Sequence, residues 1–424
     1  MTVDMSRLAW AVVLYVAAAL AVLRGPRVAR RRWKEALLLV TSLALAAGVA
    51  EVALRLVRPY ESLPRFRWIA SRRLHHVNPP SRRMFSGYVG GVPVVVDTNE
   101  DGFRTRHTRA SFARLGVRVA VLGDSFTFGS GVNEAEAFPS RLEVELARRL
   151  ERDDVGVLNA GVISYSPMLQ KIQIEDVLRG YRPSVVILLL DATDIGDDAV
   201  YRAKSRRRGE DEEFPLEGDA HLRSYGAVHE LLRPGLTWLE HRLSYPVQLA
   251  RSAVGRPEPT SANYYLNYVT FEGRQENRFF IYRYPLERTR PYFEETFRHV
   301  AAAASAAETA GARFLLAVSP RYHHWSAREC PRDWQRGAYQ IDEPFQFEYF
   351  RFFGEKAAGS SFPIFDLLPA FQATRDFPLV FPHDPHWNPS GHAFVARTLA
   401  DYLTPSALLD GVARTGRSTV RPSP

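Results

Sequence analysis

Cysteine is almost missing from this 424-residue chain, which contains only Cys330. A single cysteine excludes an intramolecular disulfide, a redox pair and a cysteine-based zinc cluster. Internal repeats are not visible either. With 46% hydrophobic and 24% charged residues, the composition is that of a globular protein with no sign of bulk disorder. The length allows one large core with accessory segments.

A nucleic-acid signature is also missing, although the formal net charge is +8. Most of the excess lies in one short segment, residues 24–35, which carries six basic residues and a single acid. The basic run at 202–208 is followed almost at once by four acidic residues at 210–213. Such a self-neutralising stretch is typical of an exposed loop, so no nucleic-acid partner is expected.

Two uncharged apolar runs, residues 8–23 and 36–50, flank the basic segment. Each is somewhat shorter than the roughly 20 residues that cross a bilayer core, but flanking Arg and Lys side chains can extend them by snorkelling. The positive-inside rule places the basic loop in the cytoplasm. We therefore predict a transmembrane hairpin over residues 1–56 in the cytoplasmic (inner) membrane, with the rest of the chain on the periplasmic side. A cleaved signal peptide followed by one anchor is the alternative.

Residues 57–115 form an Arg- and Pro-rich linker with one clear strand at 92–96, followed by Asn99-Glu100-Asp101-Gly102. Because Asp-Gly supplies the positive φ that tight turns need, we predict an accessory β-ribbon here.

From residue 116 to 405, short apolar runs alternate with amphipathic stretches. Strands are predicted at 117–123, 155–161, 184–191, 313–320 and 362–368, and helices at 140–153, 168–181, 296–312 and 389–403. This alternation predicts an α/β domain with a mainly parallel five-stranded sheet covered by helices on both faces. Two aromatic-rich insertions, 201–290 and 321–361, interrupt it and are interpreted as a packed surface subdomain or as a substrate-binding cover. Residues 406–424 are expected to be a disordered tail.

Two short motifs lie far apart in the chain but at matching edges of the predicted sheet. Gly123-Asp124-Ser125 follows the first strand, and Asp384-Pro385-His386 precedes the last helix. A serine hydroxyl needs a base to take its proton, and the base works better when a carboxylate holds its tautomer. Because functional loops lie at the carboxyl ends of parallel strands, we predict Ser125 as nucleophile, His386 as general base and Asp384 as its orienting partner.

Other candidate residues have weaker patterns. His392 lies inside the last predicted helix and is interpreted as structural, whereas His383 has no motif around it and the pairing of His323 and His324 stays open. A group of aspartates after the third strand could suggest a metal site, but their spacing fixes no ligand geometry, and we expect no metal and no cofactor; they are Asp191, Asp194, Asp197 and Asp198.

At these positions the chain resembles the SGNH (GDSL-type) hydrolase superfamily. VLGDSFTFGSGV at 121–132 is similar to its first block and HDPHWNPSGH at 383–392 to its last, while TNEDGFR at 98–104 is similar to the lead-in of membrane-anchored members. The resemblance covers roughly residues 92–405. It implies a flavodoxin-like three-layer α/β/α fold and the same roles for Ser125, His386 and Asp384.

The chain departs from the superfamily pattern at three places. The second block keeps Gly161 but ends in Ser164, and the third has Thr193 where members usually carry an asparagine. The resemblance implies an oxyanion hole made by the Ser125 and Gly161 N–H groups, with the Thr193 hydroxyl replacing the asparagine amide. Loss of one such donor costs about 2.7–4 kcal/mol of transition-state stabilisation. The Asp-x-His spacing, in place of Asp-x-x-His, is similar to polysaccharide O-acetyltransferases of the alginate type.

Three functions follow as hypotheses. The first is a membrane-anchored serine esterase that acts, outside the cytoplasm, on an ester-linked group of a glycan, lipid or small molecule. The second is an O-acetyltransferase that modifies an envelope or exported polysaccharide through the same acyl-enzyme. The third is a catalytically inactive envelope scaffold, suggested by the altered third block.

Overall fold

The computed structural model describes residues 37–42, 45, 60, 63–208, 211–214, 268–326, 328–333 and 344–410. The predicted membrane spans lie outside these residues, apart from 37–42 and 45, which are helical. Within the described ranges, the search for a helix with the length and apolarity to cross a bilayer finds none. The described residues from Leu63 onward belong to one compact unit.

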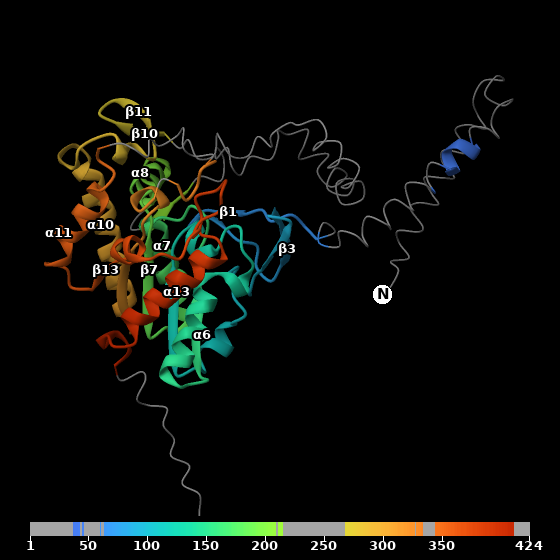
Figure 1. Cartoon of the computed structure of the whole chain (residues 1–424), viewed down its shortest axis with the longest axis horizontal. Coiled ribbons are helices and arrows are strands. Elements are labelled where there is room, and N and C mark those ends of the chain that lie inside the picture. Colours follow the sequence, from blue (N-terminus) through green and yellow to red (C-terminus); the bar gives the residue numbers. More distant parts are fainter. Residues whose placement is uncertain are drawn as a thin grey trace, which may run out of the picture. The chain divides into compact units, whose positions relative to one another are not determined.

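The centre of this unit is a five-stranded sheet in which every neighbouring pair is parallel (Figure 1). Its order is β13-β12-β7-β5-β6. The strands are β5 (Val117–Leu122), β6 (Val155–Asn159), β7 (Val185–Leu190), β12 (Arg313–Val318) and β13 (Ile364–Asp366). Every residue of β7 is buried, as expected for a central strand with both faces covered. The predicted five-stranded parallel sheet is therefore confirmed.

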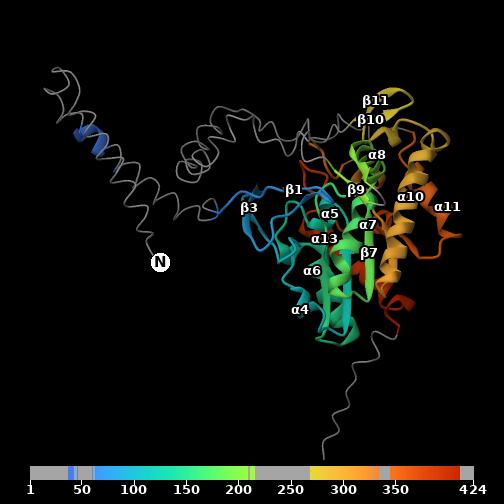
Figure 2. The same cartoon turned by 180° about the vertical axis from the view of Figure 1, so that it is seen from behind.

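Helices cover both faces of the sheet (Figures 1 and 2). Helix α6 (Phe138–Leu150) packs on α13 (Pro389–Leu403), while α10 (Leu286–Thr309) packs on α7 (Pro167–Asp176), α8 (Asp194–Lys204) and α11 (Glu348–Ala357). In chain order, the strands are arranged 2-1-3-4-5, which is the flavodoxin-like order. The order in which strands are added to the sheet reverses between β5 and β7, and a crevice is expected beyond the carboxyl ends of these two strands.

The second predicted insertion, 321–361, differs from the structure. Its end forms α11, the crossover helix between β12 and β13, so this part continues the alternation. Tyr349, Phe352 and Phe353 are buried in the main core, at the i, i+3, i+4 spacing of an amphipathic helix. The first insertion likewise contains core residues, among them Phe279 and Phe280, and α10 begins ten residues before the predicted helix start.

The tail also differs from its prediction, because the chain is ordered as far as Asp410. Arg313 donates hydrogen bonds of 2.7–2.8 Å to the carbonyl oxygens of Ala407, Leu408 and Asp410. These bonds hold η6 (Ala407–Leu409) against the domain, where Leu409 is buried. Residues 411–424 lie outside the described part of the chain.

Among the residues that the structure describes, four two-stranded antiparallel ribbons accompany the central sheet. The predicted accessory ribbon is formed by β3 (Arg83–Val89) and β4 (Val92–Asp97), but its turn is Gly90-Gly91. The Asp101-Gly102 turn lies after the strand instead; Gly102 has φ +81°, and a Cβ there would lie 2.4 Å from the Asn78 oxygen. The other ribbons are β1 (Ile69–Ser71) with β2 (His75–Val77), β8 (Arg206–Arg208) with β9 (Asp211–Glu213), and β10 (Tyr268–Phe271) with β11 (Arg274–Asn277).

Short helical segments complete the described chain. They are α4 (Arg109–Phe112), α5 (Ser125–Phe128), η2 (Glu134–Glu136), η3 (Leu178–Tyr181), η4 (Phe280–Tyr282), η5 (Tyr322–His324) and α12 (Leu368–Ala373). Of these, α5 matters most for function, because it begins three residues after the end of β5, at the expected crevice.

Candidate active site

Ser125 is the first residue of α5, at the carboxyl end of β5. Asp124 precedes it as the N-cap, and its carboxylate accepts a hydrogen bond from the Phe126 N–H at 2.9 Å. The αL residue Gly129 ends the helix after one turn. The end of β5, the Asp124 cap and the early end of α5 together place the Ser125 hydroxyl at the edge of the sheet. The residue is only 8% exposed.

His386 lies in the loop that leads into α13. Asn388 caps that helix through the Gly391 N–H at 3.0 Å, and its amide group donates to the carbonyl oxygens of Pro378 and Val380. The neighbouring Trp387 is fully buried and packs edge-on against Phe126 with 4.8 Å between ring centroids. Both sides of the loop are therefore fixed, which leaves the imidazole little freedom to rotate.

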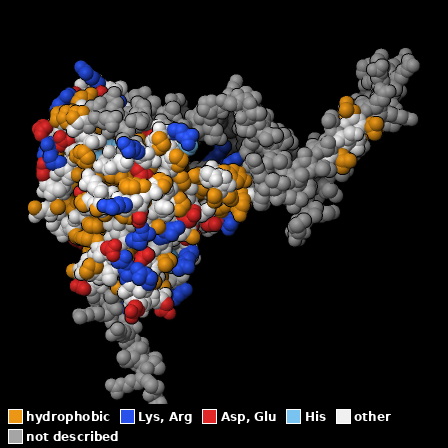
Figure 3. Space-filling view, viewed as in Figure 1, with side chains coloured by type: hydrophobic (Ala, Val, Ile, Leu, Met, Phe, Trp, Pro, Cys, Tyr) orange, Lys and Arg blue, Asp and Glu red, His pale blue; other side chains and the backbone are white. Residues whose placement is uncertain are grey.

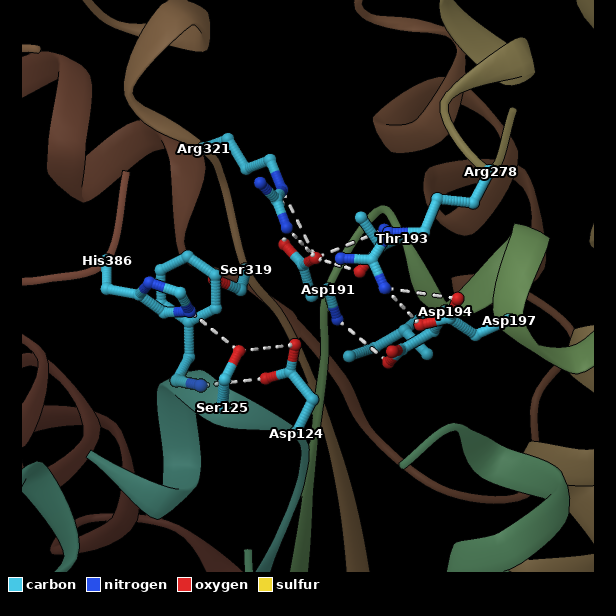
Figure 4. Close-up of polar contacts among 12 residues, drawn as sticks. Asp124, Ser125, Asp191, Thr193, Asp194, Asp197, Arg278, Ser319, Arg321 and His386 are labelled. Carbon is cyan, nitrogen blue, oxygen red and sulfur yellow. Dashed lines mark hydrogen bonds and ion pairs between the residues drawn. The ribbon is translucent and has the colours of Figure 1, made fainter. Parts of the chain in front are cut away.

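The structure brings Ser125 and His386 together across 261 sequence positions (Figure 4), and Asp384 contacts the other side of the imidazole ring. The His386 Nε2 atom lies 2.7 Å from the Ser125 hydroxyl oxygen. On the other side of the ring, Nδ1 forms a short hydrogen bond with an Asp384 oxygen, which also accepts the His386 backbone N–H at 2.9 Å. A carboxylate cannot donate, so Nδ1 carries the proton and Nε2 is left as the acceptor for the serine hydroxyl. This is the arrangement a general base requires.

Charges around the ring raise the pKa of His386. Burial alone favours the neutral imidazole, but the Asp384 carboxylate, through its charge and its hydrogen bond, and the charge of Asp124 outweigh it and raise the pKa of His386 above its ordinary value. The pKa of Asp124 is itself raised to about 6, because the group is buried and lies near the Asp191 carboxylate. Asp124 also accepts a 3.3 Å hydrogen bond from Ser125, so the hydroxyl has two acceptors within reach.

Gly161 packs directly against the nucleophile helix. A Cβ at this position would lie 2.4 Å from the Phe128 backbone nitrogen and 2.7 Å from the Thr127 carbonyl carbon. Only glycine therefore allows the loop after β6 to approach α5 this closely. The same loop is tied to β5, because the Val162 N–H donates to the Gly123 oxygen at 3.1 Å.

The three predicted oxyanion donors are not equivalent in the structure. The Ser125 N–H has no acceptor among the residues that the structure describes, whereas the Gly161 N–H donates to the Asn159 side chain at 3.1 Å. The Thr193 hydroxyl donates to Asp191 at 2.5 Å, and the Thr193 N–H contacts the same carboxylate. In this structure the Thr193 hydroxyl gives its proton to Asp191, so its oxyanion role stays a prediction that requires the hydroxyl to leave this hydrogen bond.

Protein groups already engage the aspartates that follow β7. Asp191 forms a buried ion pair with Arg321 at 2.7 Å, and Asp197 forms one with Arg278 at 2.9 Å (Figure 4). Asp194 accepts the Asp191 N–H at 3.0 Å, and Asp198 accepts the Met168 N–H at 3.0 Å at the start of α7. Burial and the neighbouring carboxylates raise the pKa of Asp194 well above its usual range, which favours its neutral form.

The other candidate histidines lie in α13, in η5 and in the loop before His386. His392 is buried in α13, where its Nδ1 accepts the Phe138 N–H at 3.2 Å, and burial lowers the pKa of His392 to about 3. His324 accepts the Arg321 N–H at 2.9 Å, and His323 is buried beside it. His383 is exposed.

Arg104 is the residue that the sequence reasoning missed. Its fully buried guanidinium donates to four carbonyl oxygens: Phe128 at 3.0 Å and Gly129 at 2.7 Å from Nη1, and Val95 at 3.0 Å and Val132 at 2.6 Å from Nη2. Two of these belong to the C-terminal end of α5. The sequence assigned no catalytic role to the lead-in motif TNEDGFR. In the structure its last residue, Arg104, holds the C-terminal end of the helix that carries the nucleophile.

Comparison with known proteins gives structural similarity at low identity. Neither a family model nor a curated protein matches the chain. A G-D-S-L family protein from Desulfitobacterium hafniense is 14% identical, with 67% of this chain and 98% of that chain covered and a TM-score of 0.32. An acetyl xylan esterase is 13% identical over 67% and 99%, with a TM-score of 0.34, and the acetylxylan esterase Axe2 from Geobacillus stearothermophilus is 11% identical over 68% and 94%, with a TM-score of 0.34. At these values the site geometry alone carries the functional conclusion.

Proposed function

We propose that this protein is a serine esterase of the SGNH type, which hydrolyses an ester through an acyl-enzyme on Ser125. The observation that carries the proposal is the 2.7 Å contact between the Ser125 hydroxyl and the His386 Nε2 atom, with Nδ1 held by Asp384. Serine, histidine and carboxylate in this order form the relay that activates a serine for acyl transfer.

The chemistry follows from the proton positions. As the Ser125 oxygen attacks the ester carbonyl carbon, its proton passes to His386 Nε2, and the imidazolium is stabilised by Asp384. The tetrahedral oxyanion accepts a hydrogen bond from the Ser125 N–H. This N–H is free to donate because a residue in the first turn of α5 has no helical partner for it. The tetrahedral adduct then expels the alcohol, which takes the proton from His386. Water, deprotonated by the same ring, finally releases the acid and regenerates Ser125.

A covalent probe of the nucleophile tests this proposal. Purified wild-type protein should react with a fluorophosphonate and hydrolyse p-nitrophenyl acetate, and Ser125→Ala should lose labelling and at least about 10³-fold in rate. Ser130→Ala is the matched control, since it removes a nearby hydroxyl from the same segment and should keep both activities. Equal labelling of Ser125→Ala and wild type, or a folded wild type that is neither labelled nor active, would contradict the esterase assignment; the latter result would favour the inactive scaffold.

The location proposed for this activity is the outer side of the cytoplasmic membrane. Supporting it are the apolar runs at 8–23 and 36–50, the basic loop between them and the charge rule that keeps such loops in the cytoplasm. Leu38, Leu39 and Leu45, within the second run, are 61–70% exposed, as expected for a helix surface that an acyl-chain environment would cover. The substrate would then be an ester-bearing glycan, lipid or small molecule outside the cytoplasm.

An O-acetyltransferase is the second candidate, favoured by the two-residue spacing of Asp384 and His386, which resembles that of alginate-type polysaccharide acetyltransferases. The acyl-enzyme would be the same, and a sugar hydroxyl would replace water. Incubation with an activated acetyl ester, with and without an uronic-acid oligosaccharide, separates the two reactions. Transfer gives acetylated sugar by mass spectrometry, whereas hydrolysis gives only free acetate at an unchanged rate.

A further inference from the structure

The β3–β4 ribbon ends in an exposed apolar tip. Its base is packed on the domain, because Met84, Val94, Val95 and Val96 are buried. Near the Gly90-Gly91 turn, in contrast, large apolar side chains are exposed: Tyr88 is 39% and Val92 54% exposed. In the space-filling view, apolar side chains gather over this ribbon (Figure 3). A two-residue turn carrying exposed tyrosine and valine is too small to form a hydrophobic core of its own.

A strongly basic surface accompanies this tip. Residues 63–97 contain six arginines and, among acidic residues, only Asp97, which gives a net charge of 6 − 1 = +5. Arg67, Arg72 and Arg82 are exposed, while Arg83 reaches Asp97 at 3.3 Å. The segment before β1 joins the ribbon, since the Phe66 N–H donates to the Phe85 oxygen at 3.0 Å and the Phe85 N–H to the Pro64 oxygen at 2.8 Å. The positive charges and the apolar tip therefore belong to one continuous stretch of chain, residues 63–97, within which β1–β2 and β3–β4 are separate ribbons.

The length of the connecting chain limits how far residues 63–97 can lie from the second apolar run. The second apolar run with its extension ends at Leu54, and the ordered unit begins at Leu63. Nine residues span at most about 30 Å when fully extended. If residues 36–54 cross the bilayer, as the proposed location requires, residue 63 is held within that distance of the membrane surface, where local concentration is high.

We propose that residues 63–97 dock onto anionic phospholipid headgroups, with Tyr88 and Val92 at the tip of the β3–β4 ribbon entering the interface and Arg67, Arg72 and Arg82 facing the lipid phosphates. Tyrosine is enriched at the level of the headgroups, and arginine side chains are attracted to an anionic leaflet within a Debye length. The docking fixes the orientation of the catalytic unit relative to the bilayer. It rests on the proposed anchoring for its proximity and goes beyond the esterase activity.

Site-specific labelling of the full-length chain in vesicles tests the docking. Cys330 is buried, and its pKa is raised to about 12 by burial, so a Cys330→Ser background leaves one reactive thiol in each labelled variant. An environment-sensitive fluorophore is attached at Val92→Cys and, as a matched control, at Val144→Cys, an exposed valine on α6 that is 66% accessible. Vesicles of phosphatidylcholine, with or without 30% phosphatidylglycerol, carry a headgroup spin label as quencher.

The label at position 92 should be quenched in the anionic vesicles, less in pure phosphatidylcholine, and the label at 144 in neither. Replacing Arg67, Arg72 and Arg82 by glutamine should lower the docking equilibrium on the order of a hundred-fold, because each arginine near an anionic surface contributes about five-fold. The same change at Arg114, Arg179 and Arg298, which are also exposed, should leave the quenching unchanged.

Equal quenching at 92 and 144, or no loss in the first triple variant, would overturn the docking. Flotation of the protein with vesicles in 1 M salt measures the anchoring separately, since screening removes the electrostatic contribution but not a membrane span. A chain that floats without quenching at 92 is anchored but not docked. A chain that is quenched at 92 but does not float supports docking and refutes the anchor. Esterase assays with a soluble substrate on the same samples report on the proposed function independently of both.

Discussion

Replacing Arg104 by lysine should destabilise the protein and impair catalysis, although the charge is kept. The guanidinium reaches four carbonyl oxygens from two nitrogen atoms, with its Cζ 5.0 Å from the centre of the Phe128 ring. A lysine ammonium is a compact point charge that cannot reproduce this planar fork. Two of the four buried carbonyl groups would lose their hydrogen bond to the guanidinium, and each such loss costs about 1–3 kcal/mol.

The expected loss is therefore about 3 kcal/mol of the free energy of unfolding. For a domain of this size, 1 kcal/mol shifts the unfolding midpoint by about 2 °C, so Arg104→Lys should melt roughly 6 °C below wild type in the same detergent. Arg106→Lys is the control: that side chain is 72% exposed and paired with Glu143, and a surface pair contributes about 0–1 kcal/mol.

Catalysis gives a second and independent measurement. Phe128 and Gly129, whose carbonyl groups accept hydrogen bonds from Arg104, lie three and four residues after Ser125 in the same turn. A small shift of the nucleophile should lower kcat by about ten- to a hundred-fold with little change in KM. If Arg104→Lys melts within 1 °C of Arg106→Lys and keeps the wild-type kcat, then Arg104 does not hold the nucleophile helix and the reasoning fails.

Three further changes have defined outcomes. Asp384→Asn should lower kcat by about 10²–10⁴-fold and move the acid limb of the kcat/KM profile to lower pH. That limb follows the raised pKa of His386, because the imidazole acts as a base only when neutral. An unshifted limb would exclude Asp384 as the partner of His386. Asp124→Asn should raise the melting temperature at pH 8 but not at pH 4. The pKa of Asp124 is about 6 in the folded protein, so the stabilisation from its protonated form is present below about pH 4 and is lost as the pH rises through 6. Equal shifts of the melting temperature at both pH values would refute this. Gly161→Ala should cost about 1–3 kcal/mol through the clash with the α5 backbone, whereas Gly354→Ala, in α11 with no atom within 4 Å of the added Cβ, should be neutral or stabilising by up to about 1 kcal/mol.

The sheet and the catalytic residues could be predicted because their signals are local. Apolar runs of five to eight residues and the helices between them fix a parallel sheet, and loops at its carboxyl edge meet by topology alone. Ser125 and His386 each lie in such a loop, so their meeting required no knowledge of side-chain packing. The i, i+3, i+4 aromatic pattern of α11 was equally local, but it was obscured by the high aromatic content of the stretch around it.

The orientation of Thr193 and the role of Arg104 could not be predicted in the same way. Each depends on a partner from a distant strand or loop: Asp191 is held by Arg321, which is 130 positions later, and Arg104 reaches carbonyl groups 24 and 25 positions later. Every residue has a backbone carbonyl oxygen, so the type of residue that accepts such a hydrogen bond does not reveal the bond in the sequence. A sequence pattern can therefore indicate that an arginine follows a turn, but not which end of which helix it supports.

Thr193 offers a direct test of which account of the oxyanion hole holds. In the structure its hydroxyl donates to the buried Asp191 carboxylate, so Thr193→Val should remove one partner of that carboxylate and cost about 1–3 kcal/mol of stability, while kcat of the folded fraction stays within a few-fold of wild type. Thr193→Ser keeps the hydroxyl and should restore the stability. If the hydroxyl instead turns toward the reacting carbonyl during catalysis, Thr193→Val loses about 10²–10³-fold in kcat at nearly wild-type stability, and Thr193→Ser recovers the rate. Melting temperature and kcat measured on the same two variants thus separate a residue that holds Asp191 from one that stabilises the transition state.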